Sequence, residues 1–159
     1  KLNDAQLALS SIGQYDVAAS PLQMAMVAAG IANDGVLMEP YLTKSVRAAN
    51  LQTVWTHKDT PMSTPMTRES AKQLQQMMVS VVNNGTGRNA RIDGVTVGGK
   101  TGTAQTSPDK PPYAWFVGWS DKPKVAVAVF VESSNTERSE IAGGRLGAPI
   151  ARDVIEALR

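Results

Sequence analysis

The sequence contains no cysteine and only one histidine among its 159 residues. The absence of cysteine excludes disulfide bonds and thiolate metal sites. The single histidine, His57, lies in a polar stretch with no partner histidine or cysteine. We therefore interpret His57 as a solvated loop residue and predict neither a metal site nor a bound cofactor. A Ser-His-Asp triad is disfavoured for the same reason.

Long apolar runs and concentrated charge are missing as well. No stretch approaches the roughly 18 consecutive apolar residues of a membrane-spanning helix. The 16 basic and 14 acidic residues are scattered and leave a net charge of +2. Because a nucleic-acid groove needs a concentrated basic face, we expect no nucleic-acid partner. The hydrophobic content of 42% suffices for one sizeable core, which predicts one domain or one part of a domain.

A serine followed by proline marks the strongest helix start. Ser20 suits the N-cap and Pro21 the first helical position, while Asn33-Asp34-Gly35 is typical of a helix end. Apolar residues occupy nearly every face of this segment, which predicts a buried helix. Helical spacing predicts three more helices, over 2–12, from Thr67 to Asn83-Asn84-Gly85, and over Pro149–Leu158.

Alternating and β-branched runs predict the strands. Short extended pieces are expected at Val36–Met38, Ser45–Arg47 and Thr53–Trp55, and longer strands at Thr96–Gln105, Tyr113–Gly118 and Lys124–Val131. Consecutive strands followed by a helix that returns across them indicate an α+β fold, with an antiparallel sheet and helices packed on it.

Residues 94–101 match the phosphate-loop pattern G-x-x-x-x-G-K-[ST] at every position. A nucleotide-binding protein is therefore a rival hypothesis. That loop needs a strand before its first glycine and a helix after its threonine. Here polar and charged residues precede Gly94, and Gly102 and Pro108 disfavour a helix after Lys100. Residues 85–90 imitate a dinucleotide-binding pattern, but they follow a helix, so we interpret them as a cap and turn.

The chemistry of the chain is concentrated at Lys100, Thr101, Gly102 and Thr103. Gly102 removes a side chain where another group must approach the strand closely. The threonine hydroxyls can bond a carboxylate, and Lys100 can hold the same anion and take part in proton transfer. An exposed strand edge can also pair with an extended peptide. On these four residues alone, an ordinary edge strand with a solvated lysine is equally plausible.

Six segments in a fixed order extend this motif to nearly the whole chain. They are Ser11–Gln14, Ser20–Ala25, Ile31–Gly35, Asn84–Gly87, Gly98–Gln105 and Ala114–Trp119. With these segments the sequence resembles the transpeptidase domain of class B penicillin-binding proteins, and most closely the actinobacterial, mycobacterial members. The resemblance implies part of a domain with the fold shared by penicillin-binding proteins and serine β-lactamases.

The resemblance implies a serine D,D-transpeptidase that cross-links peptidoglycan stem peptides and is inhibited by β-lactams. Lys100 and Thr103 would be catalytic, with the Thr103 N–H as an oxyanion-hole donor. Thr101, Gly102 and Thr103 would bind the substrate, Thr101 and Thr103 through its terminal carboxylate. Tyr113 and Trp115 would line the cleft, although core packing is an equal alternative for Trp115. The implied partners are stem peptides or their lipid-linked precursors and β-lactams, in cell-wall synthesis for division or cell shape.

The sequence departs from the family pattern in one respect. The S-x-x-K and S-x-N motifs should both precede Lys100, and nothing there matches either. Ser107–Lys110 and Ser133–Asn135 match after Lys100, in expected loops, and we interpret them as chance. We therefore expect residues 1–159 to be the C-terminal portion of a single transpeptidase domain, unstable or silent alone. An upstream segment would carry both motifs and a membrane anchor, which implies the extracytoplasmic face of the bacterial cell membrane.

Two alternatives stay open within the same superfamily. Serine β-lactamases and β-lactam sensors can share a Lys-Thr-Gly strand, so the motif at Lys100 does not exclude them. The Gly85-Thr86-Gly87 segment and the Ala104-Gln105 ending favour the transpeptidase.

Overall fold

The computed structural model describes residues 2–106 and 109–159 and is built around a three-stranded antiparallel sheet. Its strands are β5 (Val97–Ala104), β6 (Tyr113–Asp121) and β7 (Lys124–Val131), in the order β5-β6-β7. The sheet confirms the three predicted strands and the α+β class. β6 runs three residues beyond the predicted end at Gly118 because Trp119 and Ser120 are buried and still pair with β5 and β7.

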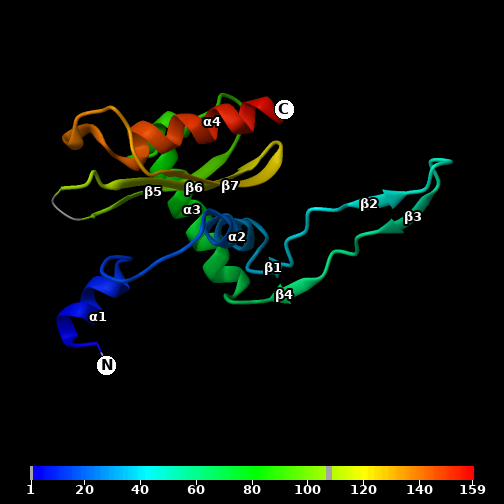
Figure 1. Ribbon diagram of the computed structural model, residues 1–159, viewed down its shortest axis with the longest axis horizontal. Coiled ribbons are helices and arrows are strands. Elements are labelled where there is room, and N and C mark those ends of the chain that lie inside the picture. The colour runs from blue at the N-terminus through cyan, green and yellow to red at the C-terminus, as the bar shows by residue number, and fades with distance from the viewer. Residues whose placement is uncertain (1, 107–108) are drawn as a thin grey trace.

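Helices cover both faces of this sheet (Figure 1). α4 (Ala148–Ala157) lies on one face, α2 (Pro21–Ala32) on the other, and α3 (Arg68–Asn84) packs against β5. Successive strand residues point to opposite faces, so Phe116 and Trp119 of β6 enter different clusters. Phe116 packs with Ile155 and other residues toward α4, whereas Trp119 packs with Ile31 and Met78.

The helix ends follow the predicted capping residues. Ser20 and Gln23 form a capping box at the start of α2: the Gln23 N–H donates to Ser20 Oγ (3.2 Å) and the Ser20 N–H to Gln23 Oε1 (2.7 Å). Thr67 caps α3 by accepting from the Ser70 N–H at 3.2 Å. α2 is buried on one side only, and the apolar side that we expect an upstream segment to cover is exposed. Leu22 is 59% exposed and Val27 46%, because among the described residues the sheet and α3 cover one side of the helix only.

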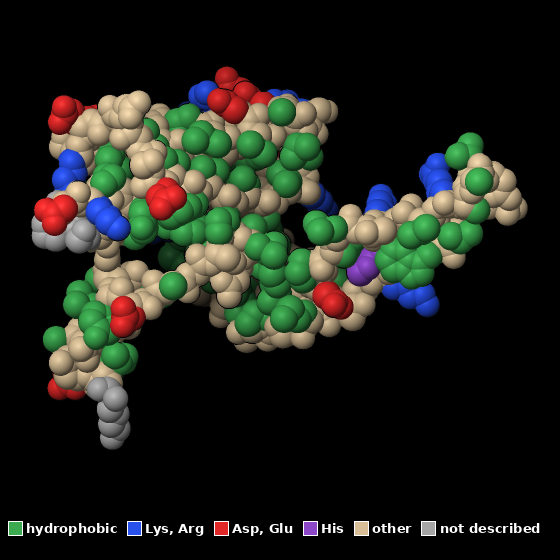
Figure 2. Space-filling view, in the orientation of Figure 1, with side chains coloured by type: hydrophobic (Ala, Val, Ile, Leu, Met, Phe, Trp, Pro, Cys, Tyr) green, Lys and Arg blue, Asp and Glu red, His purple; other side chains and the backbone are tan. Residues whose placement is uncertain are grey.

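The remaining elements extend from this body. α1 (Asp4–Ser11) lies near the N-terminus, and β1 (Leu37–Met38) pairs with β4 (Pro61–Ser63). Beyond that pair, β2 (Ser45–Arg47) and β3 (Thr53–Thr56) form an exposed ribbon that projects from the body (Figures 1 and 2). Across residues 2–106 and 109–159, none of the helices has both the length and the apolar character to cross a membrane.

His57 follows β3 and corrects an expectation, because it is half-buried instead of solvated. Its ring stacks on Tyr41 with ring centroids 3.7 Å apart and makes an edge-to-face contact with Trp55 at a centroid distance of 6.1 Å. The aromatic rings of this ribbon bury one another. The polar sequence around His57 does not reveal its contact with Tyr41, which lies 16 residues earlier.

Four sequence patterns remain to be compared with the structure. Lys100 and Thr101 lie within β5, which continues to Ala104, so no helix follows the lysine and the nucleotide-binding loop is excluded. Residues 85–90 follow α3 as a cap and a short 3-10 turn, as interpreted. Ser133–Asn135 lies outside the helices and strands, and the start of the Ser107–Lys110 match lies outside the described residues.

Candidate active site

The Lys-Thr-Gly-Thr sequence occupies the second half of β5, at the edge of the three-stranded sheet. Residues opposite each other in an antiparallel pair share a face. Lys100 pairs with Val117 and Gly102 with Trp115, so these four share the face that α2 covers in part. Thr101 and Thr103 pair with Phe116 and Ala114 and belong to the other face.

Lys100 and Thr101 each make a short polar contact. Lys100 Nζ donates to the Thr101 carbonyl at 2.6 Å. The Thr101 and Thr86 hydroxyl oxygens lie 2.7 Å apart in a hydrogen bond. Thr86 belongs to the Gly-Thr-Gly segment after α3, so this contact joins that segment to the Lys-Thr-Gly-Thr strand.

The Thr103 carbonyl is contacted from a distant part of the chain. Gln14, which is 89 residues earlier, donates from Nε2 to this carbonyl at 3.4 Å. Gln14 was not among the predicted site residues. Its only sequence indication was its place in the Ser11–Gln14 segment of the family resemblance.

Glycine residues allow another segment of the chain to pack closely against β5. The turn Gly143–Gly147 precedes α4 and packs against β5 and β6. A Cβ on Gly143 would meet the carbonyl oxygen of Trp115 and lie 2.9 Å from the Gly102 nitrogen. A Cβ on Gly102 would lie 3.2 Å from Trp115 Cβ. The close approach that Gly102 predicted is therefore made by Trp115 alone, whereas the Gly143 contact is with the backbone of Gly102.

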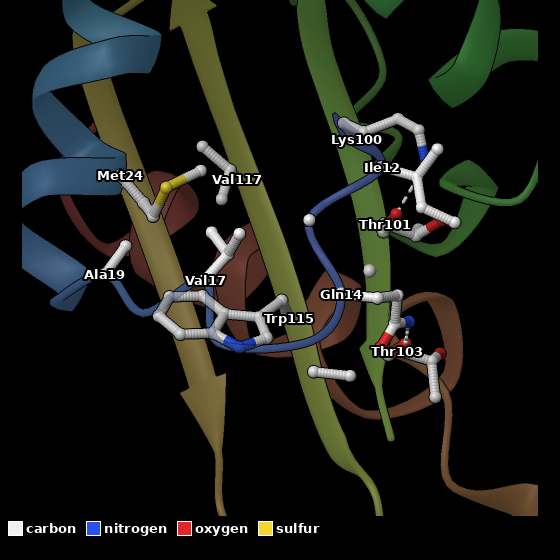
Figure 3. A pocket seen from close by; sticks show the side chains of 13 residues that line it. Ile12, Gln14, Val17, Ala19, Met24, Lys100, Thr101, Thr103, Trp115 and Val117 are labelled. Atoms are coloured by element: carbon white, nitrogen blue, oxygen red, sulfur yellow. Dashed lines mark hydrogen bonds between the residues drawn. The ribbon is translucent and has the colours of Figure 1, made fainter. Parts of the chain in front are cut away.

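A cavity of about 320 Å³ lies over this strand (Figure 3). Lys100 to Ala104 form one wall, and Trp115 and Val117 of β6 another. The third wall comes from the segment before α2 and the start of that helix, none of it predicted: Ile12, Gly13, Gln14, Val17, Ala19 and Met24. Of the two aromatic residues expected in the cleft, Trp115 lines this cavity, whereas Tyr113 packs edge-on against Phe130, with ring centroids 5.1 Å apart.

This arrangement can hold an extended ligand with a negative end. Lys100 brings a positive charge to an exposed strand position and lines the cavity together with Thr101 and Thr103. The edge strand can pair with an added peptide backbone, and backbone N–H groups at such an edge can stabilise a developing oxyanion. The apolar wall of Trp115 and Val117 suits the side chains of such a ligand.

A helix-covered antiparallel sheet with Lys-Thr-Gly on its edge strand defines the class of penicillin-recognising serine acyltransferases. Residues 1–156 match the family described as Penicillin binding protein transpeptidase domain, and the chain belongs to that family. It is 42% identical over 158 residues to "Peptidoglycan D,D-transpeptidase PbpA" of Mycolicibacterium smegmatis, covering 96% of this chain and 32% of that protein. The PbpA of Mycobacterium tuberculosis is 40% identical, with 98% and 32% covered.

Solved structures give the same result. The crystal structure of PBPA from M. tuberculosis superposes with a TM-score of 0.87 at 39% identity, covering 99% of this chain and 38% of that one. The imipenem acyl-enzyme complex of the same protein superposes with a TM-score of 0.84 at 38% identity, covering 99% and 35%. This chain thus spans about a third of the length of the curated relatives it matches.

Proposed function

We propose that this chain is the C-terminal portion of a serine D,D-transpeptidase domain, which cross-links peptidoglycan stem peptides and is acylated by β-lactams. The observation that carries the proposal is the Lys100–Thr103 strand edge beside an open cavity. The relatives named peptidoglycan D,D-transpeptidases support it, as do the β-lactam acyl-enzyme structures of M. tuberculosis PBPA.

In this proposal Lys100 holds the terminal carboxylate of the stem peptide and takes part in proton transfer. The Thr101 and Thr103 hydroxyls bond the same carboxylate. Thr101 is held in place by its hydrogen bond to Thr86. The Thr103 N–H stabilises the oxyanion that forms when a serine attacks the D-Ala-D-Ala carbonyl. One such donor lowers the activation barrier by about 3 kcal/mol.

Gly102, Trp115 and Tyr113 complete the proposed binding site. Gly102 leaves the strand open to the ligand backbone, and Trp115 gives the cavity an apolar wall. Tyr113 supports the site indirectly by packing on Phe130, with ring centroids 5.1 Å apart. Trp115 packs on the same ring at a centroid distance of 4.7 Å.

We further propose that the nucleophile lies outside this sequence. No S-x-x-K or S-x-N precedes Lys100, and the chain spans about a third of its relatives. An upstream segment would carry both motifs, together with a membrane anchor that holds the domain on the extracytoplasmic face. Exposed apolar side chains of α2 and α3, such as Leu22 and Met77, give such a segment a surface to cover.

A labelling experiment tests the proposed function. The complete domain, with the upstream segment present, is expected to form a stable covalent adduct with fluorescent penicillin. It is also expected to turn over a chromogenic cephalosporin slowly, because transfer to water is not its reaction. Labelling is read on a denaturing gel and turnover by absorbance.

The same two readouts, together with an assay of stem-peptide cross-linking, separate the alternatives. Rapid, repeated turnover would replace the transpeptidase by a serine β-lactamase. A stable adduct without cross-linking of stem peptides would favour a β-lactam sensor. No adduct at all would reject the serine acyl-transfer assignment.

A further inference from the structure

Gln14 is held in place by the end of α1. The Gln14 N–H donates to the Leu9 carbonyl (3.0 Å), and the Gly13 N–H to the Ser10 carbonyl (3.1 Å). Gly13 has a φ of +78°. These two bonds around a left-handed glycine form a Schellman motif, with Gln14 as its second residue beyond the cap. A side chain placed in this way belongs to a defined structure and not to a loose loop.

Gln14 reaches the free edge of β5 from there (Figure 3). Its side-chain amide donates to the Thr103 carbonyl, and Gln14 is the single half-buried residue in 11–20, where all others are exposed. In an antiparallel ladder the outward-facing residues alternate with those bonded to the partner strand. The Thr101 and Thr103 carbonyls both accept from side chains, Lys100 Nζ and Gln14 Nε2, which indicates that they belong to the outward-facing set.

An extended ligand that adds to this edge needs the same acceptor. Strand addition pairs a ligand N–H with an outward carbonyl, and a ligand whose reacting carbonyl lies at the Thr103 N–H would present its neighbouring amide to the Thr103 carbonyl. Gln14 Nε2 occupies that carbonyl in the ligand-free chain. The amide of Gln14 and the amide of the ligand would therefore approach the same oxygen and compete for it.

We propose that Gln14 is a specificity-determining residue that competes with the ligand's amide N–H for the Thr103 carbonyl. The inference rests on the proposed function of the Lys100–Thr103 strand. In this proposal, ligands with an amide beside the reacting carbonyl displace Gln14, whereas ligands without that amide leave it in place. The hydrogen bond is long at 3.4 Å, so its displacement slows such ligands only modestly, by about two- to fivefold.

The test compares two β-lactams that acylate a relative. Penicillin G carries a side-chain amide and imipenem a hydroxyethyl group instead, and acyl-enzyme structures of M. tuberculosis PBPA exist for both. Second-order acylation rate constants are measured on the complete domain for wild type, Gln14→Ala and Gln14→Met. Methionine keeps the length of the side chain without the donor. Gln73→Ala, on the exposed side of α3, is the matched control.

Both Gln14 variants are expected to react with penicillin G about two- to fivefold faster than wild type, with imipenem and Gln73→Ala unchanged. Unchanged penicillin G rates would overturn the inference. A faster reaction of Gln14→Ala alone would also overturn it, since Gln14 would then act through steric hindrance and not through its hydrogen bond. Slower reaction of both variants with penicillin G would overturn it as well, since Gln14 would then assist the ligand. If wild type reacts with neither compound, the proposed function itself fails.

Discussion

Replacing Lys100 by alanine is expected to slow acylation of the complete domain by penicillin G about 100-fold. The variant loses the positive charge that faces the ligand carboxylate and a donor for proton transfer. The fold should survive, because Lys100 is exposed on its strand and, among residues 2–106 and 109–159, donates to the carbonyl of the adjacent residue alone. Stopped-flow or gel-based acylation kinetics, with a thermal melt as a check on folding, measure both effects.

Lys72→Ala provides the matched control for that experiment. Lys72 is also exposed, but it lies on α3 and does not line the cavity over β5. Its removal is expected to leave the acylation rate unchanged and the stability within about 0.5 kcal/mol. Equal rates for wild type and Lys100→Ala would make Lys100 a bystander and reject the site.

Gly143→Ala is expected to lower the free energy of unfolding by about 3 kcal/mol, at the upper end for an overpacked position. The added Cβ would collide with the Trp115 carbonyl and press on the backbone of Gly102. Backbone atoms of two paired strands cannot move aside as a flexible side chain can. Because the collision falls under the Lys-Thr-Gly strand, acylation should be slowed as well.

The same substitution in a helix should have the opposite sign. Gly30 lies inside α2, and a Cβ there would lie 3.6 Å from Leu37 Cδ1, an ordinary contact distance. Gly30→Ala is therefore expected to stabilise the protein by about 0.5–1 kcal/mol through helix propensity. Chemical denaturation of both variants measures the pair. Similar destabilisation by the two substitutions would contradict the packing argument for Gly143.

Local residue chemistry predicted the regular elements well. The ends of α2 and α3 follow from capping by Ser20 and Thr67, which act within four residues of themselves. The β-branched run in β7 was likewise sufficient to place that strand. These features depend on neighbours in sequence, which a reader of the sequence can see.

Features that depend on distant contacts could not be predicted. Gln14 meets Thr103 across 89 residues. Gly143 lies under Gly102 because of the path that the chain takes into α4. The partial burial of His57 against aromatic rings also depends on which residues surround it. Composition and spacing carry no information on those surroundings.

The site itself was predicted through residue types and a family resemblance. The unusual Lys100–Thr103 strand pointed to anion and peptide binding, and the structure places Trp115 beside that strand in one cavity. The catalytic and binding roles of these residues remain proposals.

The central claim is that this chain supplies the Lys-Thr-Gly strand while another segment supplies the serine. Intact mass spectrometry after incubation with penicillin G tests it most directly, on this chain alone and together with the proposed upstream segment as a separate polypeptide. The account predicts one penicillin adduct, found only on the upstream segment and only when both are present. An adduct on this chain would contradict it and would assign the nucleophile to one of its own serines.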